Sequence, residues 1–366
     1  MKKFFHSTLS SFAVVTVWYI LLNFFVTWWV NRTPINPSFP YYSSLLSYAP
    51  KQISVWAHFD GAHYLKLATA GYVDQGTQAF FPLYPLLIRV LASLGLSPFY
   101  AGLLISLTSI TLCLTLMRYL FPNLSLLKSA TVLILPTSFF FGSLYTESFF
   151  LFETILFFLA LQKKQFLLAA VVAGLASGTR LAGSILVISL VVAIYPSLTA
   201  NKYRFVLIPL SLLGLMIYMS FLYLRFSDPL AFIHVQSMFG VGRSGNEVIL
   251  LPQVIFRYLK IFVTVPFNSL IYLRAVFEFV SFFVVLIYVC KQFRSLSHPL
   301  FIYLILSLLL PTLSGTFASI PRYLLVLVPI LYGSFHLNRL TITLFTLSLP
   351  LMLLLLSLFA SGKFVA

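Results

Sequence analysis

Residues 9–30 read LSSFAVVTVWYILLNFFVTWWV, an unbroken apolar run that decides the class of fold. A helix needs about 20 residues to cross a bilayer core of roughly 30 Å, and this run is long enough. Lys2 and Lys3 precede it, Trp28 and Trp29 end it at interface depth, and it lacks a small-residue cleavage site. We therefore predict a retained first transmembrane helix rather than a signal peptide.

The composition of the whole chain indicates the same class. Of its 366 residues, 60% are hydrophobic and 8% are charged, whereas soluble domains carry about 25% charged residues. We expect an all-α polytopic membrane protein that forms a single integral membrane domain over residues 1–366. The net charge of +16 would suggest a nucleic-acid partner in a soluble protein, but here it reports membrane topology, so we expect no nucleic acid. Cys113 and Cys290 lie inside apolar runs, which predicts free thiols.

Charged residues and Pro or Gly breaks divide the rest of the chain into further apolar segments. With a cytoplasmic N-terminus and one crossing per segment, about eleven spans result, and Lys and Arg fall on the inner side at every return. The two long outer segments, 31–97 and 225–273, are too amphipathic or interrupted for clean spans, so we expect interfacial or re-entrant helices there. The further apolar segments lie near 98–118, 129–144, 145–161, 166–180, 181–197, 205–224, 274–290, 299–317, 321–337 and 340–360.

The acidic residues mark one membrane face as the working face. The distribution of Lys and Arg alone predicts the orientation, and six of the seven acids fall in or next to the outer segments. Only Glu278 lies elsewhere, a turn below the start of its helix. This separate observation predicts a functional site on the extracytoplasmic side.

The stretch VWAHFDGAHYLKLATAGY, residues 55–72, gathers polar groups within the first outer segment. Trp56, Phe59 and His63 recur at helical spacing, and so do Asp60 and Tyr64, which predicts an amphipathic helix with Asp60 near its start. A carboxylate bounded by aromatic rings lies partly out of water, where it can act as a base toward a bound hydroxyl. The alternative is a charge that only stabilises the helix dipole.

Other polar and aromatic residues surround this carboxylate in sequence. His58 and His63 are five residues apart and do not share a helix face, so we predict no zinc site and place them in the headgroup zone. The rings of Trp56 and Tyr64 either stack on sugars or anchor at the interface. Arg89 follows two prolines beside an apolar run, a place that chain turning alone does not explain.

A second polar cluster lies in LPTSFFFGSLYTESFFLFE, residues 135–153. It ends one apolar run and starts another, which predicts a helix N-terminus with Glu147 in its first turn. Free N–H groups and the positive end of the dipole suit a phosphate there. The alternative is that Glu147 simply caps the helix.

Two arginines lie at breaks in apolar runs on the same predicted face. Arg180 interrupts the membrane in ASGTRLAG, residues 176–183, and Arg322 and Tyr323 do so in SGTFASIPRYLLVLVP, residues 314–329. The positive-inside rule disfavours arginine on the outer side, so topology does not account for either residue. A guanidinium binds phosphate oxygens in pairs and stays charged when partly buried. These positions predict a phosphate-bearing ligand.

Five stretches together resemble the PIG-V-like family, which is related to the second mannosyltransferase of glycosylphosphatidylinositol-anchor assembly. They are FDGAHYLKLATAGY, AFFPLYPLL, PTSFFFGSLYTES, SGTRLAG and PRYLLVLVP, and the similarity covers most of the chain. The resemblance implies a GT-C-like glycosyltransferase fold and a polyprenyl-phosphate sugar donor. It also implies that the acid of the first outer loop is catalytic, which matches Asp60. Glu147 and Arg180 would line the site, with Arg322 and Tyr323 near the donor phosphate.

The resemblance also bears on cofactor and source. The first loop lacks the Asp-X-Asp pair of related GT-C members, which argues against a bound divalent metal. The short chain is similar to bacterial members that make no glycosylphosphatidylinositol, which places it in a prokaryotic cell membrane with mannose or another hexose as the sugar.

We expect a hexosyltransferase that moves this sugar to a hydroxyl of a glycan or glycolipid acceptor among the membrane lipids and inverts the anomeric centre. A lipid phosphate departs without a general acid, so one carboxylate suffices. Asp60 would deprotonate the acceptor, and Arg180 or Arg322 would steady the phosphate charge. A transporter or flippase for a lipid-linked phosphate substrate is the alternative, and a phosphotransferase is a third option.

Overall fold

The computed structural model describes residues 2–36, 38–197, 202–240, 242–245, 247–333 and 339–365. Within these residues all regular structure is helical, without a strand. Three helices there are long and apolar enough to cross a membrane, within Phe4–Val30, Pro98–Leu120 and Leu270–Lys291. A fourth results if Arg204–Ser211 and Leu213–Phe226, bent by 46°, count as one span. The protein is therefore all-α with candidate membrane spans, and the number of about eleven stays a prediction.

The chain groups into two compact units. The first comprises Met1–Gly71, Leu83–Leu159 and Val328–Val365, and the second Tyr72–Pro82 and Ala160–Leu327.

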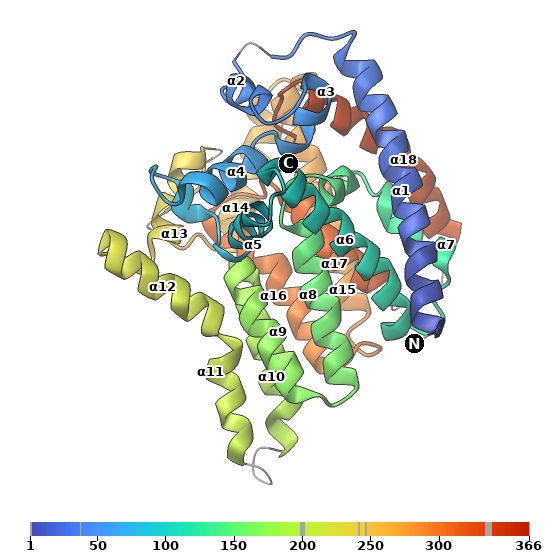
Figure 1. Ribbon diagram of the computed structural model, residues 1–366, viewed down its shortest axis with the longest axis vertical. Coiled ribbons are helices and arrows are strands. Elements are labelled where there is room, and N and C mark those ends of the chain that lie inside the picture. The colour runs from blue at the N-terminus through green and yellow to red at the C-terminus, as the bar shows by residue number, and fades with distance from the viewer. Residues whose placement is uncertain are drawn as a thin grey trace. The chain divides into compact units, whose positions relative to one another are not determined.

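In the first unit, α1 packs along α6 and against α18, and α5 packs on both α4 and α6 (Figure 1). The outward side of α1 carries exposed apolar residues such as Phe12, Leu21 and Phe24, which suits contact with lipid. The helices of this unit are α1 (Lys2–Val30), α2 (Tyr42–Leu46), α3 (Lys51–Ser54), η1 (Val55–Ala57), α4 (Asp60–Ala70), α5 (Leu83–Ser93), α6 (Pro98–Leu120), α7 (Leu126–Ala130), η3 (Thr131–Ile134), η4 (Ser138–Gly142), α8 (Glu147–Gln162, whose last residues fall in the second unit) and α18 (Arg339–Ala360).

The predicted span 129–144 is not a single helix. It consists of the end of α7 and the short helices η3 and η4, separated by a break that contains Pro136. Hydroxyl groups satisfy carbonyls that a continuous helix would have used, because Ser138 donates to Leu133 O at 2.6 Å and Ser148 donates to Phe141 O at 2.7 Å. Ser138 in this segment and Ser148 in α8 thus allow an irregular, buried backbone just before α8.

In the second unit, α9 packs on α10, α11 and α12, and α10 packs on α16. The approach of α9 and α12 is so close that a Cβ at Gly214 would clash with the carbonyl of Gly174, so small residues are required there. The helices are η2 (Thr77–Ala79), α9 (Phe166–Thr179), η5 (Leu181–Ser184), α10 (Ile185–Ile194), η6 (Tyr195–Ser197), η7 (Lys202–Val206), α11 (Leu207–Ser211), α12 (Leu213–Phe226), α13 (Ala231–His234), η8 (Val235–Phe239), α14 (Leu251–Thr264), α15 (Leu270–Lys291), α16 (His298–Leu309), η9 (Leu310–Ser314) and α17 (Ile320–Gly333, whose last residues fall in the first unit).

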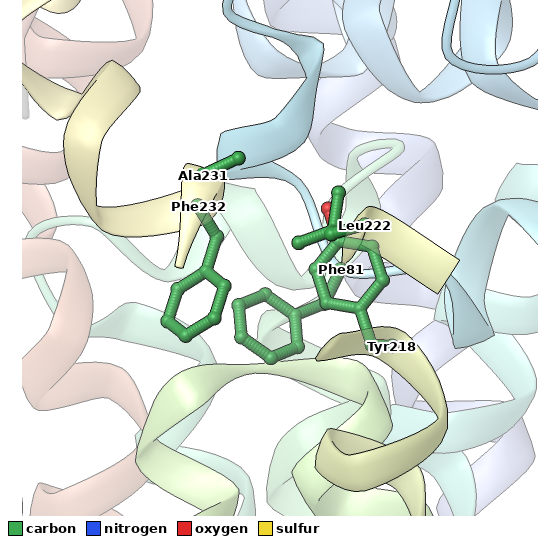
Figure 2. Close-up of a cluster of buried hydrophobic side chains, with 5 residues drawn as sticks. All are labelled: Phe81, Tyr218, Leu222, Ala231 and Phe232. Atoms are coloured by element: carbon green, nitrogen blue, oxygen red, sulfur yellow. The ribbon is translucent and has the colours of Figure 1, made fainter. Parts of the chain in front are cut away.

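A buried apolar cluster ties the segment 72–82 to α12 and α13 in the second unit. Figure 2 shows Phe81 beside Tyr218 and Phe232, and the ring centroids lie 5.0 and 5.3 Å from that of Phe81. The Tyr218 hydroxyl donates a 2.8 Å hydrogen bond to Gln78 O. Phe81 of the first outer segment therefore packs against Phe232 of the second at this cluster.

Most of the other predicted segments begin and end within a few residues of helices in the described part of the chain. The predicted segments 98–118, 166–180 and 274–290 correspond to α6, α9 and α15, of which α6 and α15 are long enough to cross a membrane and α9 is shorter. The end of the predicted segment 321–337 lies outside the described residues. Both cysteines are free thiols, with Cys113 buried and Cys290 exposed.

Candidate functional site

Asp60 is the first residue of α4, as the sequence predicted. The preceding residue, Phe59, has a φ of 53° and a ψ of −114°, a conformation that non-glycine residues rarely adopt. The next residue, Gly61, lies against Leu144, and an added Cβ would sit 3.4 Å from the Leu144 carbonyl oxygen. The strained Phe59 and the contact of Gly61 with Leu144 therefore fix the backbone at Asp60, whose side chain is partly buried.

Tyr41 and His63 form a polar pair beside Asp60. The Tyr41 hydroxyl lies 3.0 Å from His63 Nε2, and the two rings meet edge to face. Burial raises the pKa of Tyr41, and the negative charge of Asp60 raises it further. Asp60, Tyr41 and His63 thus share one electrostatic environment, which we call the Asp60 cluster. The sequence motifs missed Tyr41, because it lies 19 residues before Asp60 outside any periodic pattern.

Glu147 is the first residue of α8, also as predicted, and its side chain is 1% exposed. Its charge acts on the phenol of Tyr84, whose ring meets that of Tyr64 edge to face at 5.2 Å. Tyr64 lies on α4, three residues along from Gly61. One tyrosine from α4 and one from α5 therefore lie near the start of α8.

Two hydrogen bonds hold the start of α4 to the segment that leads into α8. The Leu144 N–H donates to Trp56 O at 2.8 Å, and the Tyr145 hydroxyl donates to His58 O at 2.8 Å. The first unit thus brings together the two stretches in which the sequence placed Asp60 and Glu147.

Trp56 and His58, which precede Asp60 in the chain, are both fully buried. The Trp56 indole donates to Asn23 Oδ1 at 2.9 Å, and burial leaves no ring face open, which favours packing over the predicted sugar contact. His58 Nδ1 lies 2.9 Å from Phe359 O, and burial lowers the pKa of His58 to about 4. These residues support the turn that precedes α4.

Arg89 has a local structural role. Its Nε donates to Ala68 O at 2.7 Å and its Nη2 to Leu67 O at 3.1 Å. These carbonyls belong to the last turn of α4, where a cation also interacts favourably with the helix dipole. The bonds explain an arginine beside apolar core without a ligand, and the predicted substrate contact of Arg89 stays a prediction.

In the second unit, Arg180 and Arg322 lie over the same aromatic ring. Their guanidinium carbons are 5.1 and 5.5 Å from the centre of the Tyr323 ring. Arg180 directly follows α9, whereas Arg322 lies in the first turn of α17 and is only 7% exposed. The helix ends confirm the predicted breaks around both arginines. The shared contact with Tyr323 brings the two side chains together.

The predicted site residues therefore form two groups. The group of the first unit consists of Asp60, Glu147, His63, Tyr64, Arg89 and Trp56, and that of the second unit consists of Arg180, Arg322 and Tyr323. The convergence of both groups on one cavity stays a prediction. No set of three or more His, Cys, Asp or Glu side chains suited to a metal ion occurs in the described part of the chain. Comparison with protein-family models and with curated proteins gave no match.

Proposed function

We propose that the protein is a GT-C-type membrane glycosyltransferase of a prokaryotic cell membrane. It moves mannose or another hexose from a polyprenyl-phosphate donor to a hydroxyl of a glycan or glycolipid on the extracytoplasmic face. The observation that carries the proposal is the pair of guanidinium groups over Tyr323.

Two like charges gathered at one ring favour an anionic ligand. Two cations that lie over one ring repel each other, and the repulsion is stronger where burial excludes water, as it does around Arg322. Arg322 also lies in the first turn of a helix, where the dipole disfavours a cation and favours an anion. A phosphate group meets both requirements, because it is an anion whose oxygens accept paired bonds from guanidinium.

The Asp60 cluster supplies the base. The Asp60 carboxylate takes the proton from the acceptor hydroxyl, whose oxygen then attacks the anomeric carbon of the donor sugar. The bond between that carbon and the phosphate oxygen breaks, and its electrons leave with the lipid phosphate. Arg180 and Arg322 stabilise the negative charge of the leaving phosphate. Attack opposite the leaving group inverts the anomeric centre, and a second carboxylate is not needed.

The test is donor binding to the full-length protein in lipid nanodiscs, with a short-chain polyprenyl-phosphate mannose as the probe. Arg180→Gln and Arg322→Gln should each weaken binding by about tenfold or more, since each removes a charge-assisted contact to phosphate. The matched control is Arg225→Gln, which removes an exposed arginine at the end of α12 and should bind as the wild type does. Unchanged binding in both site variants would remove the proposal.

A transporter or flippase for a lipid-linked phosphate substrate is the second candidate. Two acids of α8 favour it, because Glu147 and Glu153 are 1% and 3% exposed and buried acids in apolar helices often line transport paths. The two functions predict different products. In sealed vesicles a flippase moves intact donor across the bilayer, whereas a transferase consumes it and releases polyprenyl phosphate.

A further inference from the structure

A buried acid lies beside the start of α17, outside the five stretches that carry the family resemblance. Glu278, in α15, is 2% exposed, and its Oε2 accepts a 2.5 Å hydrogen bond from the hydroxyl of Tyr258, in α14. Its Oε1 lies 3.6 Å from Nε of Arg274. An acid buried in an apolar helix is destabilising unless it is paired, and such residues are retained where they serve function.

The acid and its tyrosine hold the backbone that leads into α17. The Tyr258 oxygen accepts the N–H of Phe317 at 3.1 Å and lies 3.2 Å from Thr316 Oγ1. The backbone N–H of Ser319 also interacts with the Glu278 carboxylate. The N–H groups of Phe317 and Ser319 therefore bond to side chains of two other helices, Tyr258 of α14 and Glu278 of α15.

Ser319 is the residue on which this support acts. It has a φ of 67°, in the left-handed region that non-glycine residues occupy only when their surroundings impose it. Arg243 Nη2 donates to its side-chain oxygen at 3.2 Å. Its carbonyl oxygen accepts the N–H groups of both Arg322 and Tyr323 at 3.1 Å. The conformation of Ser319 thus determines the path of the first turn of α17 and the positions of Arg322 and Tyr323.

We infer that Glu278 and Tyr258 are positioning residues for the lipid phosphate. They hold Ser319 in its left-handed conformation and so direct Arg322 and Tyr323 toward the phosphate. The inference rests on the proposed function, since it takes Arg322 as a phosphate ligand. It adds the only acid that the sequence placed away from the working face.

The experiment measures binding of a short-chain polyprenyl monophosphate to the full-length protein in nanodiscs. Tyr258→Phe and Glu278→Ala should each raise the Kd about tenfold, because each removes the buried hydrogen bond between the two side chains. Glu278→Gln should stay within about threefold of the wild type, since its amide oxygen still accepts the Tyr258 hydroxyl. The control Tyr223→Phe removes a hydroxyl from a side chain that is 60% exposed, and it should change nothing.

Hydrogen exchange supplies a local readout that a general loss of stability would not produce. In Tyr258→Phe the amide of Phe317 should exchange faster, while the amides of α6 keep their wild-type rates. If Glu278→Ala does not fold, Tyr258→Phe decides the matter.

The outcomes separate the inference from the proposed function. Wild-type binding by Tyr258→Phe and Glu278→Ala, together with lost binding by Arg322→Gln, would overturn the positioning role alone. Wild-type binding by Arg322→Gln would remove the phosphate site itself.

Discussion

The hydroxyl of Tyr145 donates a 2.8 Å hydrogen bond to the backbone carbonyl of His58, two residues before Asp60. Tyr145 also lies two residues before Glu147 and is 1% exposed. One buried bond therefore joins the turn in front of α4 to the turn in front of α8. Because Asp60 is the proposed base, the geometry of this bond bears on turnover.

Tyr145→Phe should reduce turnover more than donor affinity. The change leaves the His58 carbonyl without this donor, which lowers the free energy of unfolding by about 1–2 kcal/mol and loosens the start of α4. Turnover, donor Kd and the thermal midpoint in nanodiscs check the prediction. Tyr195→Phe is the control, because that side chain is 71% exposed. Equal turnover by Tyr145→Phe and the wild type would show that this bond does not position Asp60.

Tyr323 should act through its ring rather than its hydroxyl. Tyr323→Phe keeps the aromatic face over which both guanidinium groups lie, so donor affinity should change by less than about threefold. Tyr323→Ala removes that face and should weaken donor binding by about tenfold. Binding titrations with a polyprenyl-phosphate sugar compare the two variants. Equal losses in both would assign the effect to the hydroxyl instead.

Arg89→Gln should affect stability and leave donor binding unchanged. The variant loses the paired bonds to Leu67 O and Ala68 O, which lowers the free energy of unfolding by about 1 kcal/mol. Thermal unfolding and donor titration of the same preparation separate the two effects. Weaker donor binding at an unchanged thermal midpoint would return Arg89 to the binding site that the sequence predicted.

His58 should make stability depend on pH. Its pKa falls from 6.5 to about 4 on burial, so between these values the unfolded state binds a proton that the folded state does not. The stabilisation is complete above pH 6.5 and is lost as the pH falls toward 4, by up to about 3 kcal/mol.

Thermal midpoints measured from pH 7 to pH 4.5 test this effect. They should fall for the wild type and for His298→Gln, whose histidine is exposed, and fall less for His58→Gln. The same slope in all three proteins would contradict the assignment.

Much of the helical framework could be predicted from local sequence. The apolar run of residues 9–30 lies within α1, and Asp60 and Glu147 start α4 and α8 where polar residues interrupt apolar ones. These features depend on periodicity and helix-end chemistry, which act over a few residues. The segment 129–144 escaped the same reasoning, because hydroxyl groups such as that of Ser138 replace helical hydrogen bonds inside an apolar run.

The supporting contacts of the candidate site could not be predicted in this way. Tyr41 meets His63 across 22 residues, and Tyr258 meets Phe317 across 59 residues. Such pairs depend on tertiary packing and leave no trace in local spacing. The sequence accordingly pointed to Asp60 and Arg322 but missed Tyr41 and Tyr258, whose contacts form only in the folded chain.

The most direct test of the account is turnover by Asp60→Asn. Asn keeps the shape of the side chain but cannot accept the proton, so sugar transfer should fall by roughly a hundredfold or more while donor binding persists. Asp74→Asn is the matched control, because Asp74 is exposed in the loop after α4.

The measurement follows transfer of labelled mannose from polyprenyl-phosphate mannose to acceptors in a native membrane extract. We expect a nearly inactive Asp60→Asn that still binds the donor, beside a fully active Asp74→Asn. Wild-type turnover by Asp60→Asn would contradict the account at its centre.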